Sequence, residues 1–207
     1  MRTIEETILI EPTPLHQTRE VRVGIVGYGT VGRATAEILA LNAEEIQRRT
    51  DGVSIRVTRL CRKGARSSEV GVNGIAVVPN WEKVVHADDV DIVVEAIGGT
   101  DVAYQVIRAS IEKGKAVVTA NKALIAQFGE ELFALADQKK LPIGIEASVG
   151  GGVPVIRAIS EALAADRVQA VYGIVNGTAN FILTEMENHG VEFGEALRQA
   201  QEAGYAE

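Results

Sequence analysis

The sequence predicts an α/β protein built on a doubly wound parallel sheet, and three observations point to it. A short apolar run at 21–26 leads into the glycine-rich segment GYGTVG at 27–32. Strand-like and helix-like stretches then alternate until about residue 145. The run DIVVEAI at 91–97 is almost continuously apolar, as expected of a strand buried on both faces. Such alternation favours parallel strands joined by right-handed helical crossovers.

The apolar patterns place the elements in order along the chain. After the first strand at 21–26, we expect further strands at 54–60, 74–78, 91–97, 116–119 and 143–146. We expect helical segments at 34–41, 81–86, 102–113 and 130–140. The first helix should begin within or just after Gly32. Gly114 and Pro142 are suited to ending the last two helices.

The pattern changes near residue 148, which predicts a second domain. Three consecutive glycines at 150–152 precede Pro154 and a helix to about residue 165. A strand over 168–175, an Asn-Gly turn and two further helices are expected next. We therefore divide the chain into an N-terminal extension (1–20), an α/β domain (21–147) and the beginning of an α+β domain (148–207). The extension is interpreted as a tail or an added edge strand.

Composition narrows the class of protein. The chain has 207 residues, of which 46% are hydrophobic and 24% charged, as in ordinary globular proteins. A net charge of -7 argues against a nucleic-acid partner, and no apolar run is long enough to suggest a membrane partner. The single cysteine, Cys61, excludes an internal disulfide framework and suits a reducing, cytoplasmic location. The acidic start with two prolines does not resemble a secretory signal.

The glycine segment is the strongest functional signal. Gly27 permits a tight turn, Gly29 lets a phosphate approach the backbone, and Gly32 allows close packing of helix on strand. A strand, a glycine turn and a helix N-terminus together form a cradle for a dinucleotide diphosphate. The alternative is an ordinary glycine turn that binds no nucleotide.

The end of the second strand bears on the choice between the two nicotinamide cofactors. NAD-binding folds favour an acid there, to accept hydrogen bonds from the ribose. This chain instead has Arg62 and Lys63, which suit the additional phosphate of NADP. The alternative is a solvated basic loop, and NAD remains possible.

Three other strand ends carry candidate residues. Gly98-Gly99-Thr100 could face a cofactor or form a plain turn. Lys122 could contact the cofactor ribose or substrate, or lie on the surface. Glu146 runs into the glycine loop, where a carboxylate and backbone carbonyls could bind a cation. A helix cap is the simpler interpretation of Glu146 from its local pattern.

Six segments together resemble the homoserine dehydrogenases. They are VGIVGYGTVGRA, DIVVEAIGGT, VVTANKALIA, GIEASVGGGVPVI, GIVNGTANFILTEM and AQEAGYAE. The resemblance covers residues 21–207. It implies a Rossmann domain over 21–147 and a substrate-binding and dimerisation domain beginning at 148. It also implies NAD(P)-dependent interconversion of L-homoserine and L-aspartate 4-semialdehyde, a step of threonine, methionine and isoleucine biosynthesis.

The resemblance also assigns roles to individual residues. The diphosphate would be held by Gly27, Gly29, Thr30, Val31 and Gly32. Arg62 and Lys63 would meet a 2′-phosphate, and Thr100 and Lys122 would lie near the nicotinamide, with Lys122 a catalytic candidate.

Residues nearer the end of the chain are assigned in the same way. Gly204 would lie against the cofactor, Glu207 would act in catalysis and bind the substrate ammonium, and Thr178 would help shape the substrate pocket. The family's sodium site corresponds to Glu146, Val149, Gly151 and Val153.

One departure from the family pattern affects activity. The family continues past GYAE with acids and a lysine that is the usual candidate for proton transfer, and these are not in this sequence. We therefore expect the fragment to bind NADP but to turn over poorly, and expect a homodimer of the complete enzyme. The alternatives are another nicotinamide dehydrogenase and a non-catalytic NADP-binding or assembly module.

Overall fold

The structure is a computed structural model that describes residues 19–206. Most of the extension expected over 1–20 thus lies outside the described residues, and Glu20 is the first residue of a strand. The chain divides into two compact units between Ile145 and Glu146. Each unit is described by itself.

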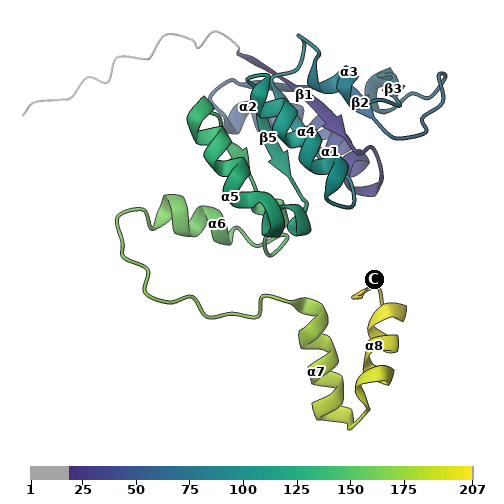
Figure 1. Ribbon diagram of the computed structural model, residues 1–207, viewed down its shortest axis with the longest axis vertical. Helices are drawn as coiled ribbons and strands as arrows, with labels where there is room; N and C mark the ends of the chain where they lie inside the picture. Colours follow the sequence, from purple (N-terminus) through teal and green to yellow (C-terminus); the bar gives the residue numbers. More distant parts are fainter. Residues whose placement is uncertain (1–18, 207) are drawn as a thin grey trace, which may run out of the picture. The chain divides into compact units, whose positions relative to one another are not determined.

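The first unit is built on one six-stranded sheet with strand order β3-β2-β1-β4-β5-β6 (Figure 1). The strands are β1 (Glu20–Val26), β2 (Ser54–Cys61), β3 (Val77–Val78), β4 (Ile92–Glu95), β5 (Ala116–Thr119) and β6 (Ile143–Gly144). Every neighbouring pair is parallel. This is the strand order of the dinucleotide-binding Rossmann fold, and it confirms the predicted fold class.

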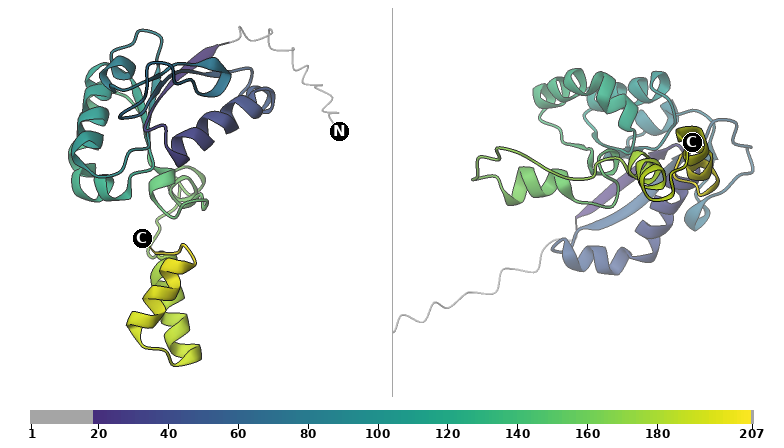
Figure 2. Two further views of the ribbon diagram at one scale, coloured as in Figure 1. Left: turned by 90° about the vertical axis from the view of Figure 1, so that its right-hand side faces the viewer. Right: turned by 90° about the horizontal axis from the view of Figure 1, so that it is seen from below.

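Helices cover both faces of this sheet. The helices are α1 (Thr30–Leu41), α2 (Ala43–Arg49), α3 (Glu82–Val85), α4 (Asp101–Glu112) and α5 (Lys122–Lys139). Successive side chains of a strand point to opposite faces, so Ile25 packs with Ala36 of α1, whereas Val26 packs with Val84 of α3 and Val106 of α4. In the left view of Figure 2, α1 (purple) and the pair α4 and α5 (teal to green) lie on opposite sides of the sheet.

Two helices begin earlier than the sequence pattern predicts, and one helix was not predicted. Helix α1 begins at Thr30 rather than near residue 34, with Gly29 at its N-cap. Helix α5 begins at Lys122 rather than at 130, because the Asn121 side chain accepts a bond from the Leu124 amide and caps it. The unpredicted α2 is a short charged helix in which Glu45 forms ion pairs with Arg48 and Arg49.

Two strands are shorter than expected. β6 ends at Gly144 rather than 146, because Glu146 begins a 3₁₀ turn, η2 (Glu146–Ser148). β3 covers two residues rather than five, because a second 3₁₀ turn, η1 (Val72–Gly74), precedes it.

The second unit contains helices and an irregular segment. Helices α7 (Gly177–His189) and α8 (Phe193–Glu202) pack around Ile182, Ala196 and Ala200. The helix expected to reach residue 165 is instead a single α-helical turn, α6 (Val155–Arg157), followed by a π turn, η3 (Ala158–Ala162).

The strand predicted over 168–175 is not formed. A strand is stabilised by pairing with a neighbour, and within residues 19–206 none pairs with this segment. Its apolar side chains are consequently exposed, with Tyr172 at 94% and Val175 at 88%. The prediction was therefore wrong for this structure, although the apolar pattern was identified correctly.

Across the part of the chain that is described, no helix is long and apolar enough to cross a membrane.

Candidate functional site

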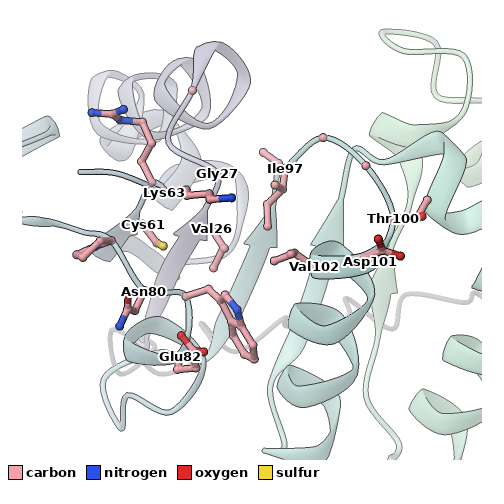
Figure 3. A pocket seen from close by; sticks show the side chains of 17 residues that line it. Val26, Gly27, Cys61, Lys63, Asn80, Glu82, Ile97, Thr100, Asp101 and Val102 are labelled. Atoms are coloured by element: carbon pink, nitrogen blue, oxygen red, sulfur yellow. The ribbon is translucent and has the colours of Figure 1, made fainter. Parts of the chain in front are cut away.

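A cleft of about 730 Å³ opens at the carboxyl ends of β1, β2 and β4 (Figure 3). It is lined by the turn after β1, by 61–63 at the end of β2, and by residues 79–82 and 96–102. The strand order reverses between β1 and β4, and ligands of open α/β sheets bind at this switch point. The cleft brings together Gly27, Gly29, Arg62, Lys63 and Thr100, all of them predicted site residues.

Close packing requires two glycines of the turn. Gly27 has φ +105°, and a Cβ there would lie 2.3 Å from the Ala96 carbonyl oxygen. A Cβ on Gly32 would lie 2.1 Å from the Gly27 carbonyl oxygen. The Gly27 and Tyr28 amides both donate to the Cys61 carbonyl, at 2.9 and 2.8 Å, which ties the turn to the end of β2. These two glycines therefore shape the turn itself.

Gly29 differs because its surroundings are open. A Cβ there would meet no atom within 4 Å, and the residue lines the cleft at the N-cap of α1. Thr30 and Val31 follow in the exposed first turn of α1. The first amides of a helix have no partner within it and carry partial positive charge. The turn thus offers a bare, positively polarised cradle that fits a diphosphate.

Tyr28, inside the glycine motif, is buried and holds a second loop in place. Its hydroxyl accepts a hydrogen bond from the Val72 amide at 3.1 Å, and the Arg33 guanidinium lies 5.5 Å from its ring centroid. This link connects the glycine turn to the loop that follows Arg62 and Lys63. Sequence reasoning missed it, although an aromatic residue inside the motif was the available signal.

The basic pair at the end of β2 has an acidic partner that the sequence analysis did not identify. Arg62 donates from Nε and Nη2 to the Glu69 carboxylate, at 3.2 and 2.5 Å. The Arg62 guanidinium lowers the pKa of Glu69 through this bond. Lys63 is shown lining the cleft opposite Thr100 and Asp101 in Figure 3. Glu69 lies seven residues after Arg62, so only the fold of the loop brings them together.

Cys61 also lines the cleft, but its environment does not favour a nucleophile. The side chain is buried, and burial raises the pKa of its thiol to about 11. A neutral thiol at physiological pH fits the predicted packing role.

The second half of the sheet contributes Thr100, at the N-cap of α4, to the cleft. Lys122 is the first residue of α5, exposed, and not among the residues that line the cleft. Beneath these loops Glu95 is completely buried, and burial raises the pKa of its carboxyl.

In the second unit, Glu146 caps a helix. Its two carboxylate oxygens accept from the amides of Ile156 and Arg157, at 3.1 and 3.0 Å. The proposed sodium ligands Val149, Gly151 and Val153 lie in the loop between, in which Gly150 and Gly152 have positive φ. Each carboxylate oxygen keeps a second lone pair, so capping and cation binding are compatible. The described residues contain no group of three or more His, Cys, Asp or Glu side chains suited to a metal.

The remaining predicted residues also belong to this unit. Thr178 lies in α7, and its hydroxyl donates to the Tyr205 carbonyl. Gly204, with φ +75°, follows α8. Glu207 lies outside the described residues.

Comparison with known proteins gives consistent results. The family described as "Homoserine dehydrogenase, NAD binding domain" matches residues 27–146, and "Homoserine dehydrogenase" matches 154–207. The chain is 43% identical to the homoserine dehydrogenase of Neisseria gonorrhoeae and 45% identical to that of Pseudomonas aeruginosa. Each match covers 91% of this chain and 43% of the relative. The chain therefore spans less than half the length of these relatives.

Solved structures agree with the sequence matches. A homoserine dehydrogenase from Thiobacillus denitrificans has a TM-score of 0.83 and 44% identity, covering 91% of this chain and 44% of that one. A hyperthermophilic archaeal homoserine dehydrogenase in complex with NADPH has a TM-score of 0.74 and 26% identity, covering 90% of this chain and 62% of that one. With both parts of the chain matched by family descriptions, and with this fold and cleft, the chain belongs to the homoserine dehydrogenase family.

Proposed function

We propose that this chain is the cofactor-binding part of an NADP-dependent homoserine dehydrogenase, with NAD as a second possible cofactor. The observation that carries the proposal is the open space above Gly29, at the start of α1 and beside the basic end of β2. A family member in complex with NADPH supports the same choice of cofactor.

Each part of the cleft has a role in this proposal. The turn and the first amides of α1, from Gly27, Gly29, Thr30, Val31 and Gly32, hold the diphosphate. Lys63 and Arg62 bind the 2′-phosphate. The Glu69 pair uses Nε and Nη2 of Arg62, which leaves Nη1 outside the pair to donate to a phosphate oxygen.

The nicotinamide half would lie along Thr100, with Lys122 at the start of α5 nearby. When bound, the nicotinamide ring supplies a site that accepts or delivers a hydride. The protein then has to orient the substrate carbon and control the hydroxyl proton. We assign Glu207 to the substrate ammonium, Thr178 to the pocket wall, and Gly204 to the cofactor, following the family resemblance.

We further propose that Glu146 and the carbonyl oxygens of Val149, Gly151 and Val153 bind a sodium ion. The capped turn at α6 supports this, because it fixes the carboxylate at one end of a loop whose positive-φ glycines can turn carbonyls toward one ion. A monovalent ion there would stiffen the loop rather than take part in hydride transfer.

The substrate and setting follow from the family and are proposals for the whole enzyme, since the chain spans less than half of its relatives. The substrates are L-homoserine and L-aspartate 4-semialdehyde, in threonine, methionine and isoleucine biosynthesis. We place the enzyme in the cytoplasm, where a buried, unpaired Cys61 is stable, and propose that it acts as a homodimer.

Cofactor choice can be tested on the 207-residue chain by calorimetry. The double variant Arg62→Gln, Lys63→Gln should weaken NADP binding about tenfold or more, because two phosphate contacts are lost. NAD has no 2′-phosphate, so its affinity should change less than about threefold. Lys113→Gln, which removes a charge at the far end of α4, is the matched control.

Equal losses for the two cofactors would refute the 2′-phosphate role. If the unmodified chain bound neither cofactor at millimolar concentration, the proposed function would itself be wrong.

A further inference from the structure

Glu95 is a buried carboxylate that the proposed function has not used. It ends β4, is 0% exposed, and forms no ion pair within residues 19–206. Burying a carboxylate without a cation is costly unless hydrogen bonds compensate. The hydrogen bonds of Glu95 therefore have to compensate for its burial.

The two oxygens of Glu95 connect two loops. Oε1 accepts from the Ile97 amide at 2.6 Å, in the loop between β4 and α4. Oε2 accepts from the Thr119 hydroxyl at 2.5 Å, at the end of β5. The Thr119 hydroxyl oxygen in turn accepts a hydrogen bond from the backbone amide of Asn121 at 3.0 Å. The register that pairs Glu95 with Thr119 in the parallel sheet makes this geometry possible.

Asn121 closes the network. Its Oδ1 accepts from the Leu124 amide and caps α5, and its Nδ2 donates to the carbonyls of Ile97, at 3.3 Å, and Gly99, at 2.7 Å. The loop from Ile97 to Gly99 is thus bound at one amide and two carbonyls.

In this loop the Ile97 side chain packs against the cluster around Val93 and Val106, but the two glycines that follow cannot fix their conformation in this way. Gly98 and Gly99 have no side chain, a Cβ on either would meet no atom within 4 Å, and Gly99 has φ +78°. The same residues line the cleft. A bare backbone wall with so much conformational freedom loses considerable entropy when ordered, unless outside groups have already fixed it.

The wall belongs to the second mononucleotide half of the sheet, formed by β4, β5 and β6. In this fold each half binds one mononucleotide, and the basic end of β2 belongs to the other half. We propose that Glu95, Thr119 and Asn121 are positioning residues that pre-form the Ile97–Gly99 wall for the nicotinamide half of the cofactor. The proposal rests on the proposed function, because it takes this cleft as the cofactor site.

The test compares two ligands of the 207-residue chain. NADPH spans both halves of the cleft, whereas adenosine 2′,5′-bisphosphate reports on the adenosine half alone. The variants are Thr119→Val, which removes the hydroxyl, and Asn121→Asp, which keeps an acceptor for the α5 cap but removes the Nδ2 donor. The control is Thr58→Val, which removes a hydroxyl bonded to the Asp89 carbonyl at 2.7 Å, away from the cleft.

Both test variants should raise the NADPH dissociation constant about tenfold and that of the bisphosphate less than about twofold. Thr58→Val should leave both constants within about twofold of the unmodified chain. Amide hydrogen exchange over 97–99, measured without ligand, should become about tenfold faster in the test variants.

The other results would overturn the proposal. Equal weakening of both ligands would indicate a general structural role, and unchanged NADPH binding or unchanged exchange would show that the network does not hold the wall. If the unmodified chain bound neither ligand, the proposed function would be wrong, and with it the role of the wall in cofactor binding. The exchange measurement needs no ligand, so it would still show whether the network orders the loop.

Discussion

Individual glycines in the turn after β1 have separable tasks. A Cβ on Gly32 would lie 2.1 Å from the Gly27 carbonyl oxygen, whereas Gly29 faces open space and has φ −94°, which any L-residue can adopt. Gly32 is therefore needed for folding, and Gly29 leaves space for a ligand at the cleft.

This difference predicts opposite effects of two alanine substitutions. Gly29→Ala should cost only about 0.5 kcal/mol of stability but weaken NADPH binding about tenfold or more, because the methyl group enters the diphosphate cradle. Gly32→Ala should destabilise the fold by about 2 kcal/mol through overpacking. Urea unfolding and calorimetric titration measure the two effects. A Gly29→Ala chain that binds NADPH normally would place the diphosphate elsewhere.

At the residue scale, the sequence pattern located cleft residues where a motif is local, and it did not reveal contacts that the fold makes between distant positions. Gly27, Gly29, Arg62 and Lys63 were predicted because each follows a recognisable strand, and all four line the cleft. Glu69 was missed, since its contact with Arg62 depends on the path of a loop. The Glu95–Thr119 bond was equally hidden, because the pattern locates each strand end but not the register between strands.

At the level of elements, the ion pair between Arg22 and Asp91 links the N-terminal ends of β1 and β4. The Arg22 backbone amide and Nε donate to Asp91 Oδ2 at 2.8 and 3.0 Å, and Nη2 donates to Oδ1 at 2.7 Å. These bonds lower the pKa of Asp91 to about 2, chiefly through the Arg22 side chain. Two central strands are thereby joined just before β4 begins.

The pH dependence of stability should report this pair. A depressed carboxyl pKa stabilises the fold above its unfolded value of 3.8, and this contribution is lost as the pH falls toward 2. Because both side chains are about one third exposed, we expect solvent to reduce the contribution to about 1 kcal/mol. Asp91→Asn should be less stable at pH 6 by about this amount and lose less stability between pH 4 and pH 2. The measurement is the free energy of unfolding by urea as a function of pH. If this free energy changed with pH in the same way for the unmodified chain and for Asp91→Asn, the assignment would be contradicted.

Apolar periodicity predicted well which segments form strands and helices, but it predicted poorly where these elements begin and end. The strand at 116–119 matches β5, in which Val117 and Thr119 are buried and Val118 on the other face is exposed. Helix α5 was started eight residues late, since Asn121 caps it through a side-chain bond that no periodicity reveals. The segment 168–175 shows the reverse case, in which a clear strand pattern has no pairing strand among residues 19–206.

At the level of the molecule, the two units differ in how much apolar surface they bury. In the first unit three clusters, which contain Ile25, Val93 and Leu132 respectively, pack between the sheet and its helices. In the described part of the second unit the buried apolar side chains are Ile182, Ala196 and Ala200. Burial of apolar area is the main stabilising contribution, so the units should differ in stability.

We therefore predict that the chain does not unfold in a single step. Native-state hydrogen exchange at rising urea concentration, read by mass spectrometry, should show loss of protection in α7 and α8 well before β1, β4 and β5. Ile182→Ala should lower the protection of α7 and α8 alone, whereas Val93→Ala, a matched core truncation in β4, should lower that of the sheet. NADPH should raise the protection of the first unit, because a ligand stabilises the state that binds it. Loss of protection in both units at one urea concentration would show that they unfold as a single cooperative structure, despite the division of the chain at Ile145.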